Sequence, residues 1–159
     1  MARAGFYAIE SHEIRFGRDG EWYSDGERIA NAKISALFSR SIRRDPEGGY
    51  RLQMGDERAR IVVDDTPFVV RSLDGDPQRG FTLTLNDGSS EPLDLSTLRS
   101  GADNALYARV KGAEEARFLR PAHYALARFI EGDEHSGFAI ECAGRRHRIE
   151  PRRTEAAAR

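Results

Sequence analysis

The fold is decided by a stretch of sequence that occurs twice. Residues 40–61 read RSIRRDPEGGYRLQMGDERARI, and residues 128–149 read RFIEGDEHSGFAIECAGRRHRI. A shift of 88 positions aligns the two stretches without a gap. The matched pairs are Arg40 with Arg128, Ile42 with Ile130, Asp45 with Asp133, Gly49 with Gly137, Tyr50 with Phe138, Leu52 with Ile140, Arg58 with Arg146, Arg60 with Arg148 and Ile61 with Ile149. Hairpins and amphipathic helices also share such patterns by chance, but the gapless match favours a structural repeat.

Each copy has the pattern of a helix followed by a hairpin. Apolar residues recur at helical spacing in residues 31–44, with Asn31 as the N-cap, and a second helix is predicted for residues 121–130. The stretches after each helix alternate apolar and polar residues between turns that contain glycine. We therefore predict that residues 105–151 form a unit that repeats residues 29–63.

Outside the repeat, turn signals separate several further strands. Asp19-Gly20 and Asp25-Gly26 are hairpin turns, because both residue types tolerate positive φ. They flank the pair Trp22-Tyr23. The other predicted strands are residues 60–63, 68–72, 81–85, 106–110 and 115–119.

These elements predict an α+β protein of two tandem similar units, each a small antiparallel sheet packed on one helix. The first unit, with extra strands, is predicted for residues 1–85, and a connector rich in Gly, Ser and Asp for residues 86–104. The second unit is predicted for residues 105–151. Residues 152–159 are charged and alanine-rich, so we expect a disordered tail.

The composition argues against several classes of function. With 25 Lys and Arg against 26 Asp and Glu, the net charge is −1, so no overall field attracts nucleic acid or an anionic membrane. The single Cys142 excludes an internal disulfide. The chain shows no secretory signal and no apolar stretch of membrane-spanning length. We expect a cytoplasmic, soluble protein without a cofactor.

Three stretches carry a resemblance to a known family. They are Trp22 to Gly26, Ile61 to Val69 (IVVDDTPFV) and Tyr107 to Arg120 (YARVKGAEEARFLR). Together they resemble the bacterial family catalogued as domain of unknown function 1285. The resemblance implies two similar α and β units in tandem and a role in ligand sensing or signalling. It implies no reaction.

The third of these stretches contains the strongest candidate site. Glu115 and Arg117 are two residues apart on a predicted strand and therefore share a face, and Arg120 follows at the start of a helix. Two arginines beside a carboxylate are a common way to hold a carboxylate or phosphate. The structural alternative is an ion-pair network that joins the strand to the helix. Because both interpretations fit the residues, both stay open.

Aromatic residues could line the same site. Trp22, Tyr107 and Tyr124 present large rings with polar tips, which suits a small-molecule pocket. Packing in the core is the alternative, and it is the more frequent role of such residues.

Other chemistry is weakly encoded. The histidines are spread singly, so no zinc site or catalytic triad is indicated, and only His123 is a candidate acid or base. Asp64-Asp65 fits a turn before Pro67 better than a metal site. The basic residues 145–148 with 152–153 could contact phosphates, but neighbouring acids dilute them.

The sequence favours a regulatory or sensing module over an enzyme. We expect it to bind a small anionic metabolite between its two halves through Glu115, Arg117 and Arg120, with Tyr107, Tyr124 and Trp22 nearby. One alternative is a hydrolase-like enzyme that uses His123 or Glu115 as acid or base. The other is an adaptor whose exposed sheet edges bind a protein partner.

Overall fold

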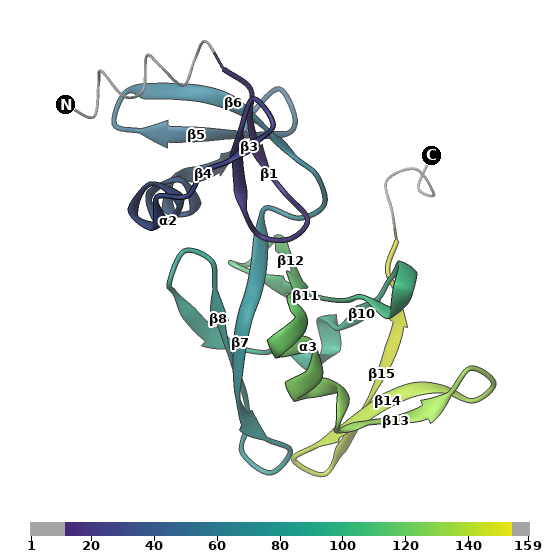
Figure 1. The fold of residues 1–159 in the computed structure, drawn as a ribbon. Coiled ribbons are helices and arrows are strands. Elements are labelled where there is room, and N and C mark those ends of the chain that lie inside the picture. Colours follow the sequence, from purple (N-terminus) through teal and green to yellow (C-terminus); the bar gives the residue numbers. More distant parts are fainter. Residues whose placement is uncertain (1–11, 154–159) are drawn as a thin grey trace. The chain divides into compact units, whose positions relative to one another are not determined.

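The computed structural model describes residues 12–153 of the chain. This part of the chain is mostly strand, with two α-helices, α2 (Ala32–Ser41) and α3 (Arg120–Ala127) (Figure 1). Neither helix is long and apolar enough to cross a membrane. The predicted α+β class, with two sheets that each pack with one helix, is confirmed.

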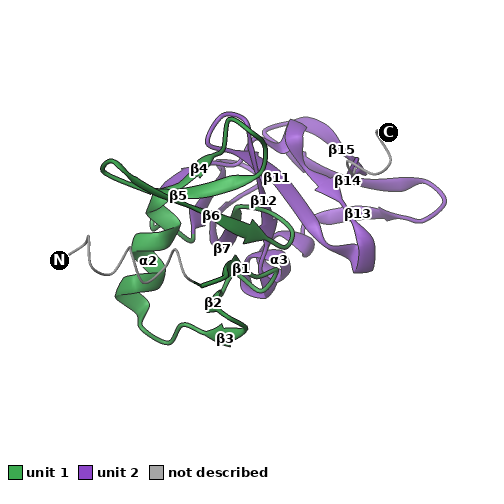
Figure 2. Cartoon of the chain, turned by 90° about the horizontal axis from the view of Figure 1, so that it is seen from above, with its two compact units in different colours: residues 1–68, 86–88 green, residues 69–85, 89–159 purple. Residues whose placement is uncertain are grey.

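The chain divides into two compact units, coloured separately in Figure 2. Unit 1 consists of Met1–Phe68 with Asn86–Gly88. Unit 2 consists of Val69–Leu85 with Ser89–Arg159. The boundary therefore falls near residue 68, and unit 1 takes a short segment from further along the chain.

Unit 1 contains a six-stranded sheet with the order β3-β2-β1-β6-β5-β4. Its strands are β1 (Ile14–Phe16), β2 (Trp22–Ser24), β3 (Glu27–Arg28), β4 (Ile42–Arg44), β5 (Tyr50–Met54) and β6 (Glu57–Val63). All neighbours are antiparallel except β1 and β6, which run parallel. The sheet is thus mixed and not purely antiparallel, because the chain passes through α2 and a hairpin before β6 lies beside β1.

The core of unit 1 is built around Trp22. Its ring centroid lies 4.8 Å from that of Phe16 and 5.4 Å from that of Phe38. The indole Nε1 donates to Ser39 Oγ at 3.0 Å, and the side-chain amide of Asn86 donates to the same oxygen at 3.0 Å. Because these buried polar groups satisfy one another, the core accepts them without an unpaired donor.

Unit 2 contains a nine-stranded sheet with the order β13-β14-β15-β10-β11-β12-β7-β8-β9. Its strands are β7 (Phe68–Asp76), β8 (Gly80–Leu85), β9 (Ser90–Pro92), β10 (Arg99–Ser100), β11 (Leu106–Val110), β12 (Glu114–Phe118), β13 (Ile130–Asp133), β14 (Gly137–Cys142) and β15 (Arg145–Pro151). Strands β9 and β10, with two short 3-10 turns, lie in the segment predicted as a connector, residues 86–104. Its leucines Leu93, Leu95 and Leu98 are buried, so this segment is part of the fold.

Six strands of unit 2 repeat the plan of unit 1. The order β12-β11-β10-β15-β14-β13 matches β3-β2-β1-β6-β5-β4, with α3 in place of α2. The two helices begin 88 positions apart, as do β6 and β15. Strand β10 also lies parallel to β15, as β1 does to β6. The structural repeat therefore includes the strands before each helix, which the sequence comparison did not reach.

The structure ends both helices earlier than the sequence pattern predicts. The Asn31 side chain caps α2 as expected, accepting from Lys33 N and Ile34 N. However, α2 ends at Ser41, and Ile42 adopts an extended conformation with φ −67° and ψ 131°. Ile42 fits the helical period, but its side chain is buried as the first residue of β4. In the same way, Ile130 was predicted as the end of the second helix but is the first residue of β13.

Candidate functional site

Five of the six predicted ligand-binding residues lie in unit 2. Their positions are Tyr107 on β11, Glu115 and Arg117 on β12, and Arg120 and Tyr124 on α3. The sixth, Trp22, lies in unit 1 and is 1% exposed among the aromatic core described above. Trp22 thus has the packing role that was the alternative in the sequence.

The register of β11 and β12 brings three of these residues to one face of the sheet. Tyr107 lies directly opposite Arg117, and Arg109 lies opposite Glu115. Because side chains alternate along a strand, Glu115, Arg117 and Tyr107 point to the same side. Although Tyr107 points to this face, it is only 2% exposed, so other side chains cover its ring.

Arg152 completes this cluster, and the sequence analysis missed it. Its Nη2 lies 2.8 Å from Glu115 Oε1, and its Nε lies 3.1 Å from each carboxylate oxygen. Its guanidinium carbon lies 4.0 Å from the centroid of the Tyr107 ring. Arg152 belongs to the segment that we expected to be a disordered tail, of which residues 154–159 lie outside the described residues. Its place in the repeat, 88 positions after Asp64, was the signal that could have found it.

The backbone of Arg152 explains why its side chain is held there. Arg152 N donates to Ser100 O at 2.7 Å, just as Asp64 N donates to Phe16 O at 3.0 Å in unit 1. Each contact extends the parallel pairing at the end of the last strand of a repeat. The side chain of Arg152 then covers Tyr107 and binds Glu115.

The junction of β12 and α3 carries positive charge beside a histidine. Burial lowers the pKa of His123, and the positive charge of Arg117 lowers this pKa further. The rings of His123 and Tyr124 meet edge to face, with centroids 5.9 Å apart. Tyr124 is 65% exposed and Arg120 is exposed, so this junction is open to solvent.

The start of α3 adds to this positive character. Leu119 is the N-cap, in an extended conformation and without a side-chain cap, and the first turn contains no acidic residue. Leu119 N donates to Val70 O at 3.0 Å, which fixes the junction to β7. A helix N-terminus without a cap or an acid leaves partial positive charge on its N–H groups.

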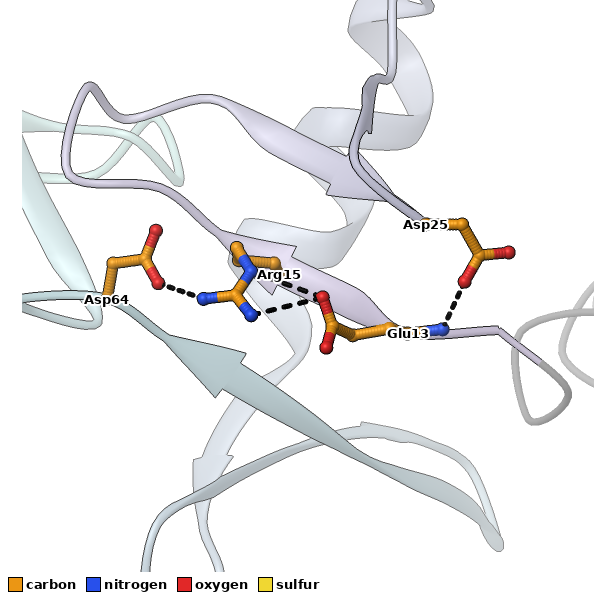
Figure 3. Close-up of polar contacts among 4 residues, drawn as sticks. All are labelled: Glu13, Arg15, Asp25 and Asp64. Atoms are coloured by element: carbon orange, nitrogen blue, oxygen red, sulfur yellow. Dashed lines mark hydrogen bonds and ion pairs between the residues drawn. The ribbon is translucent and has the colours of Figure 1, made fainter.

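Unit 1 has a polar network of a different kind (Figure 3). The Arg15 guanidinium contacts Asp64 and also donates to Glu13 Oε1 at 3.1 and 3.2 Å. Asp25 accepts from Glu13 N at 2.8 Å and pairs with His12, and both contacts hold its pKa below the ordinary value. These ion pairs and the backbone hydrogen bond of Glu13 fix the start of β1, so they form a structural network. Among residues 12–153, no group of three or more His, Cys, Asp or Glu side chains is placed to hold a metal ion.

Comparisons with known proteins find similarity to one family. Residues 7–66 match the family described as Domain of unknown function (DUF1285), N-terminal domain. A DUF1285 family protein from Silicibacter pomeroyi DSS-3 has a similar solved structure, with a TM-score of 0.69 and 25% identity over 92% of this chain and 83% of that one. A DUF1285 family protein from Shewanella baltica OS155 shares the fold, with a TM-score of 0.59 and 18% identity over 75% of this chain and 93% of that one. No curated protein matches this sequence. Unit 1 therefore matches the N-terminal domain of the DUF1285 family, and the fold along most of the chain is similar to that of solved DUF1285 family proteins.

Proposed function

We propose that this protein is a non-catalytic sensing module that binds a small carboxylate or phosphate at the β12–α3 site. This site is defined by Arg117, Arg120, His123 and Tyr124. One observation carries the proposal: the charge of Arg117 acts on His123 at the start of a helix that has neither a cap nor an acid in its first turn. These groups would all favour an anion over a cation.

The Glu115–Arg152 pair supports this assignment. Glu115 is two residues from Arg117 on the same face of β12 and could otherwise compete with an external anion. Its carboxylate instead accepts three hydrogen bonds from Arg152. Glu115 and Tyr107 therefore act as positioning residues in the proposal, and the ligand is bound by Arg117 and Arg120.

His123 gives the module a way to respond to its ligand. An anion beside His123 offsets the charge of Arg117 and so raises the pKa of the imidazole. By linkage, protonated His123 then strengthens anion binding, so affinity rises as the pH falls. Tyr124 offers an exposed ring against which an organic anion can pack.

Thermal unfolding with a panel of anions tests the proposal. The panel contains inorganic phosphate, di- and tricarboxylates and nucleotides, with neutral sugars as the reference. A ligand present at about a hundred times its Kd stabilises the folded state by about 2.7 kcal/mol and raises Tm by several degrees. We expect this rise with an anion, its loss in Arg117→Ala and its partial recovery in Arg117→Lys.

An arginine at the other end of α3 controls for general charge effects. Arg128 follows the last turn of α3 and lies over the Phe129 ring at 4.9 Å. Arg128→Ala should leave the ligand-induced rise in Tm unchanged. Equal losses in Arg117→Ala and Arg128→Ala, or a rise in Tm that persists in both, would contradict the β12–α3 site. As a second readout, the NMR titration of His123 should shift to higher pH when the anion is bound.

A further inference from the structure

One face of unit 1 carries four arginines on three adjacent strands. Arg43 lies opposite Arg51, Arg51 lies opposite Arg60, and Arg58 lies on the neighbouring row opposite Gln53. Opposite residues share a face of the sheet, with Cβ atoms about 5 Å apart. We call Arg43, Arg51, Arg58 and Arg60 the arginine face. Arg43, Arg58 and Arg60 are exposed, and Arg51 is half-buried.

The opposite side of the same strands forms the core. Leu52, which alternates with Arg51 along β5, is fully buried, and Ile42 on β4 is 4% exposed. The arginines therefore lie on the solvent side of a sheet whose other side is packed. Their position follows from the alternation of the strands and does not depend on a flexible loop.

Within residues 12–153, acidic side chains neutralise little of this face. Arg43 donates to backbone carbonyl oxygens only, of Arg40 at 3.0 Å and of Ile42 at 2.6 Å. Arg51 donates to Arg44 O at 2.8 Å and to Gln53 Oε1 at 3.0 Å.

The other two arginines of the face have few acidic partners. Arg60 pairs with Asp45 at 3.4 Å, and Arg58 forms no ion pair with any described residue. Like charges directly opposite one another destabilise a sheet. The row of Arg43, Arg51 and Arg60 therefore lowers the stability of the sheet, and the needs of folding do not explain why it is there.

The repeat in unit 2 shows that the fold does not require this charge. The positions equivalent to the arginine face hold Glu131, Ala139, Arg146 and Arg148. There Arg146 pairs with Glu131 and with Glu141, both at 3.9 Å. The same strands can thus carry a balanced face, and unit 1 has an unbalanced one.

Two further features indicate which kind of partner would bind the arginine face. Acidic residues border it at both hairpin ends, Asp45 and Glu47 at one and Asp56 at the other, so a long polyanion would meet repulsion on either side. Val62 on the same side of β6 is 37% exposed. An exposed face with arginines and an apolar side chain has the composition of a protein interface.

From this pattern we infer that the arginine face of unit 1 binds an acidic segment of a partner protein. The carboxylates of the segment would pair with Arg43, Arg51 and Arg58, and its apolar atoms would cover Val62. Arginine forms two parallel hydrogen bonds with a carboxylate, which suits such pairing. This surface belongs to unit 1 and is independent of the β12–α3 site of unit 2.

The experiment titrates the full chain with a peptide of repeating Glu-Gly units and, as the neutral control, with the matching Gln-Gly peptide. NMR signals of the arginine Nε–H groups report which arginines are contacted. We expect the Glu-Gly peptide to shift the signals of Arg43, Arg51 and Arg58 and the Gln-Gly peptide to leave them unchanged. The shifts should decrease with added salt, because exposed charges are screened.

Two double variants decide whether the binding belongs to this face. Arg51→Ala with Arg58→Ala should weaken peptide binding by about tenfold or more, since both removed charges face the partner. The matched control is Arg146→Ala with Arg148→Ala, which removes the arginines of unit 2 at the positions equivalent to Arg58 and Arg60. It should change the affinity for the peptide less than twofold, roughly the scatter measured for exposed pairs. Arg43→Glu, which copies Glu131, provides an independent test if the first pair fails to fold.

Three outcomes would overturn the inference. The first is that millimolar Glu-Gly peptide shifts none of the arginine signals. The second is that the two double variants lose affinity equally. The third is that single-stranded DNA, or vesicles containing phosphatidylserine, bind this face more tightly than the acidic peptide, which would assign it to a different class of partner.

Discussion

Two regions of the molecule share one backbone plan and differ in charge. Strands β4, β5 and β6 of unit 1 have the same order and register as β13, β14 and β15 of unit 2. The rows at equivalent positions are Arg43, Arg51 and Arg60 in unit 1 and Glu131, Ala139 and Arg148 in unit 2. Buried apolar residues fix the backbone in both, whereas the exposed residues are free to differ. The two repeats therefore share a fold and differ in the charge pattern of their exposed faces.

The largest effect is expected in the core, where the repeats also differ. Trp22 lies opposite Phe16, and Leu106 holds the equivalent place opposite Ser100. Trp22→Leu should lower the free energy of unfolding by about 3 kcal/mol, because it removes two aromatic contacts and leaves a cavity. Urea unfolding measures this loss. Tyr124→Ala, at a side chain that is 65% exposed, is the control and should change stability by about 0.5 kcal/mol or less. Equal losses in the two variants would contradict the central place of Trp22 in the core of unit 1.

The residues that follow the last strand of each repeat give the next effect. Arg152→Asp gives position 152 the same residue type as Asp64, its equivalent in unit 1. The change also puts a second acid beside Glu115. We expect a loss of about 2 kcal/mol, reduced by the partial exposure of Glu115. Asp64→Arg, the reverse exchange, should cost less, because the contacts of Asp64 with Arg15 are solvent-exposed. Chemical denaturation of both variants decides the order, and a larger loss for Asp64→Arg would contradict it.

Smaller changes in the free energy of unfolding are expected from substitutions on the exposed faces of the two sheets, with opposite signs in the two units. Arg43→Glu relieves the repulsion with Arg51 and should raise the free energy of unfolding by about 0.5 kcal/mol. Glu131→Arg breaks the pair with Arg146 and should lower it by a similar amount, about 0.5 kcal/mol. Both changes should shrink in high salt. Thermal melts at low and high ionic strength measure them, and two changes of the same sign would break the comparison.

The smallest effect concerns protonation at α3. Burial and Arg117 place the folded-state pKa of His123 below its value in the unfolded chain. This group therefore contributes stability above the unfolded pKa, and the contribution is lost as the pH falls through the folded pKa. Arg117→Ala should raise the pKa of His123 and make this loss smaller, whereas Arg128→Ala should not. NMR titration of the His123 ring measures the shift, and an unchanged pKa in Arg117→Ala would refute the coupling.

The sequence predicted the repeat where apolar residues and glycines recur at one spacing. Residues 50–61 and 138–149 align because both hairpins need the same buried positions and turns. Most of the strands before each helix were predicted, but the comparison of the two halves did not match them, because the connections there differ in length. The short strand β4 escaped because Ile42 fits both a helical period and a strand.

The candidate site was predicted only in part, for a similar reason. Strand alternation placed Glu115 and Arg117 on one face, which the register with β11 agrees with. The contact between Glu115 and Arg152 joins residues 37 positions apart and needs the parallel pairing of β10 with β15. Local sequence patterns do not contain such a pairing, so the residue that binds Glu115 was placed in the tail.

The contact between Asn86 and Ser39 has a consequence for how the protein is made. Asn86 belongs to unit 1, although β7 and β8 of unit 2 precede it in the chain. During synthesis, the core around Trp22 stays incomplete after β6 has left the ribosome, until Asn86 emerges and donates to Ser39 Oγ. A ribosome that stalls between Val63 and Asn86 would therefore leave Ser39 Oγ without the amide donor of Asn86, while the indole of Trp22 already has its acceptor. Unit 1 is therefore completed only after the first two strands of unit 2 have been made.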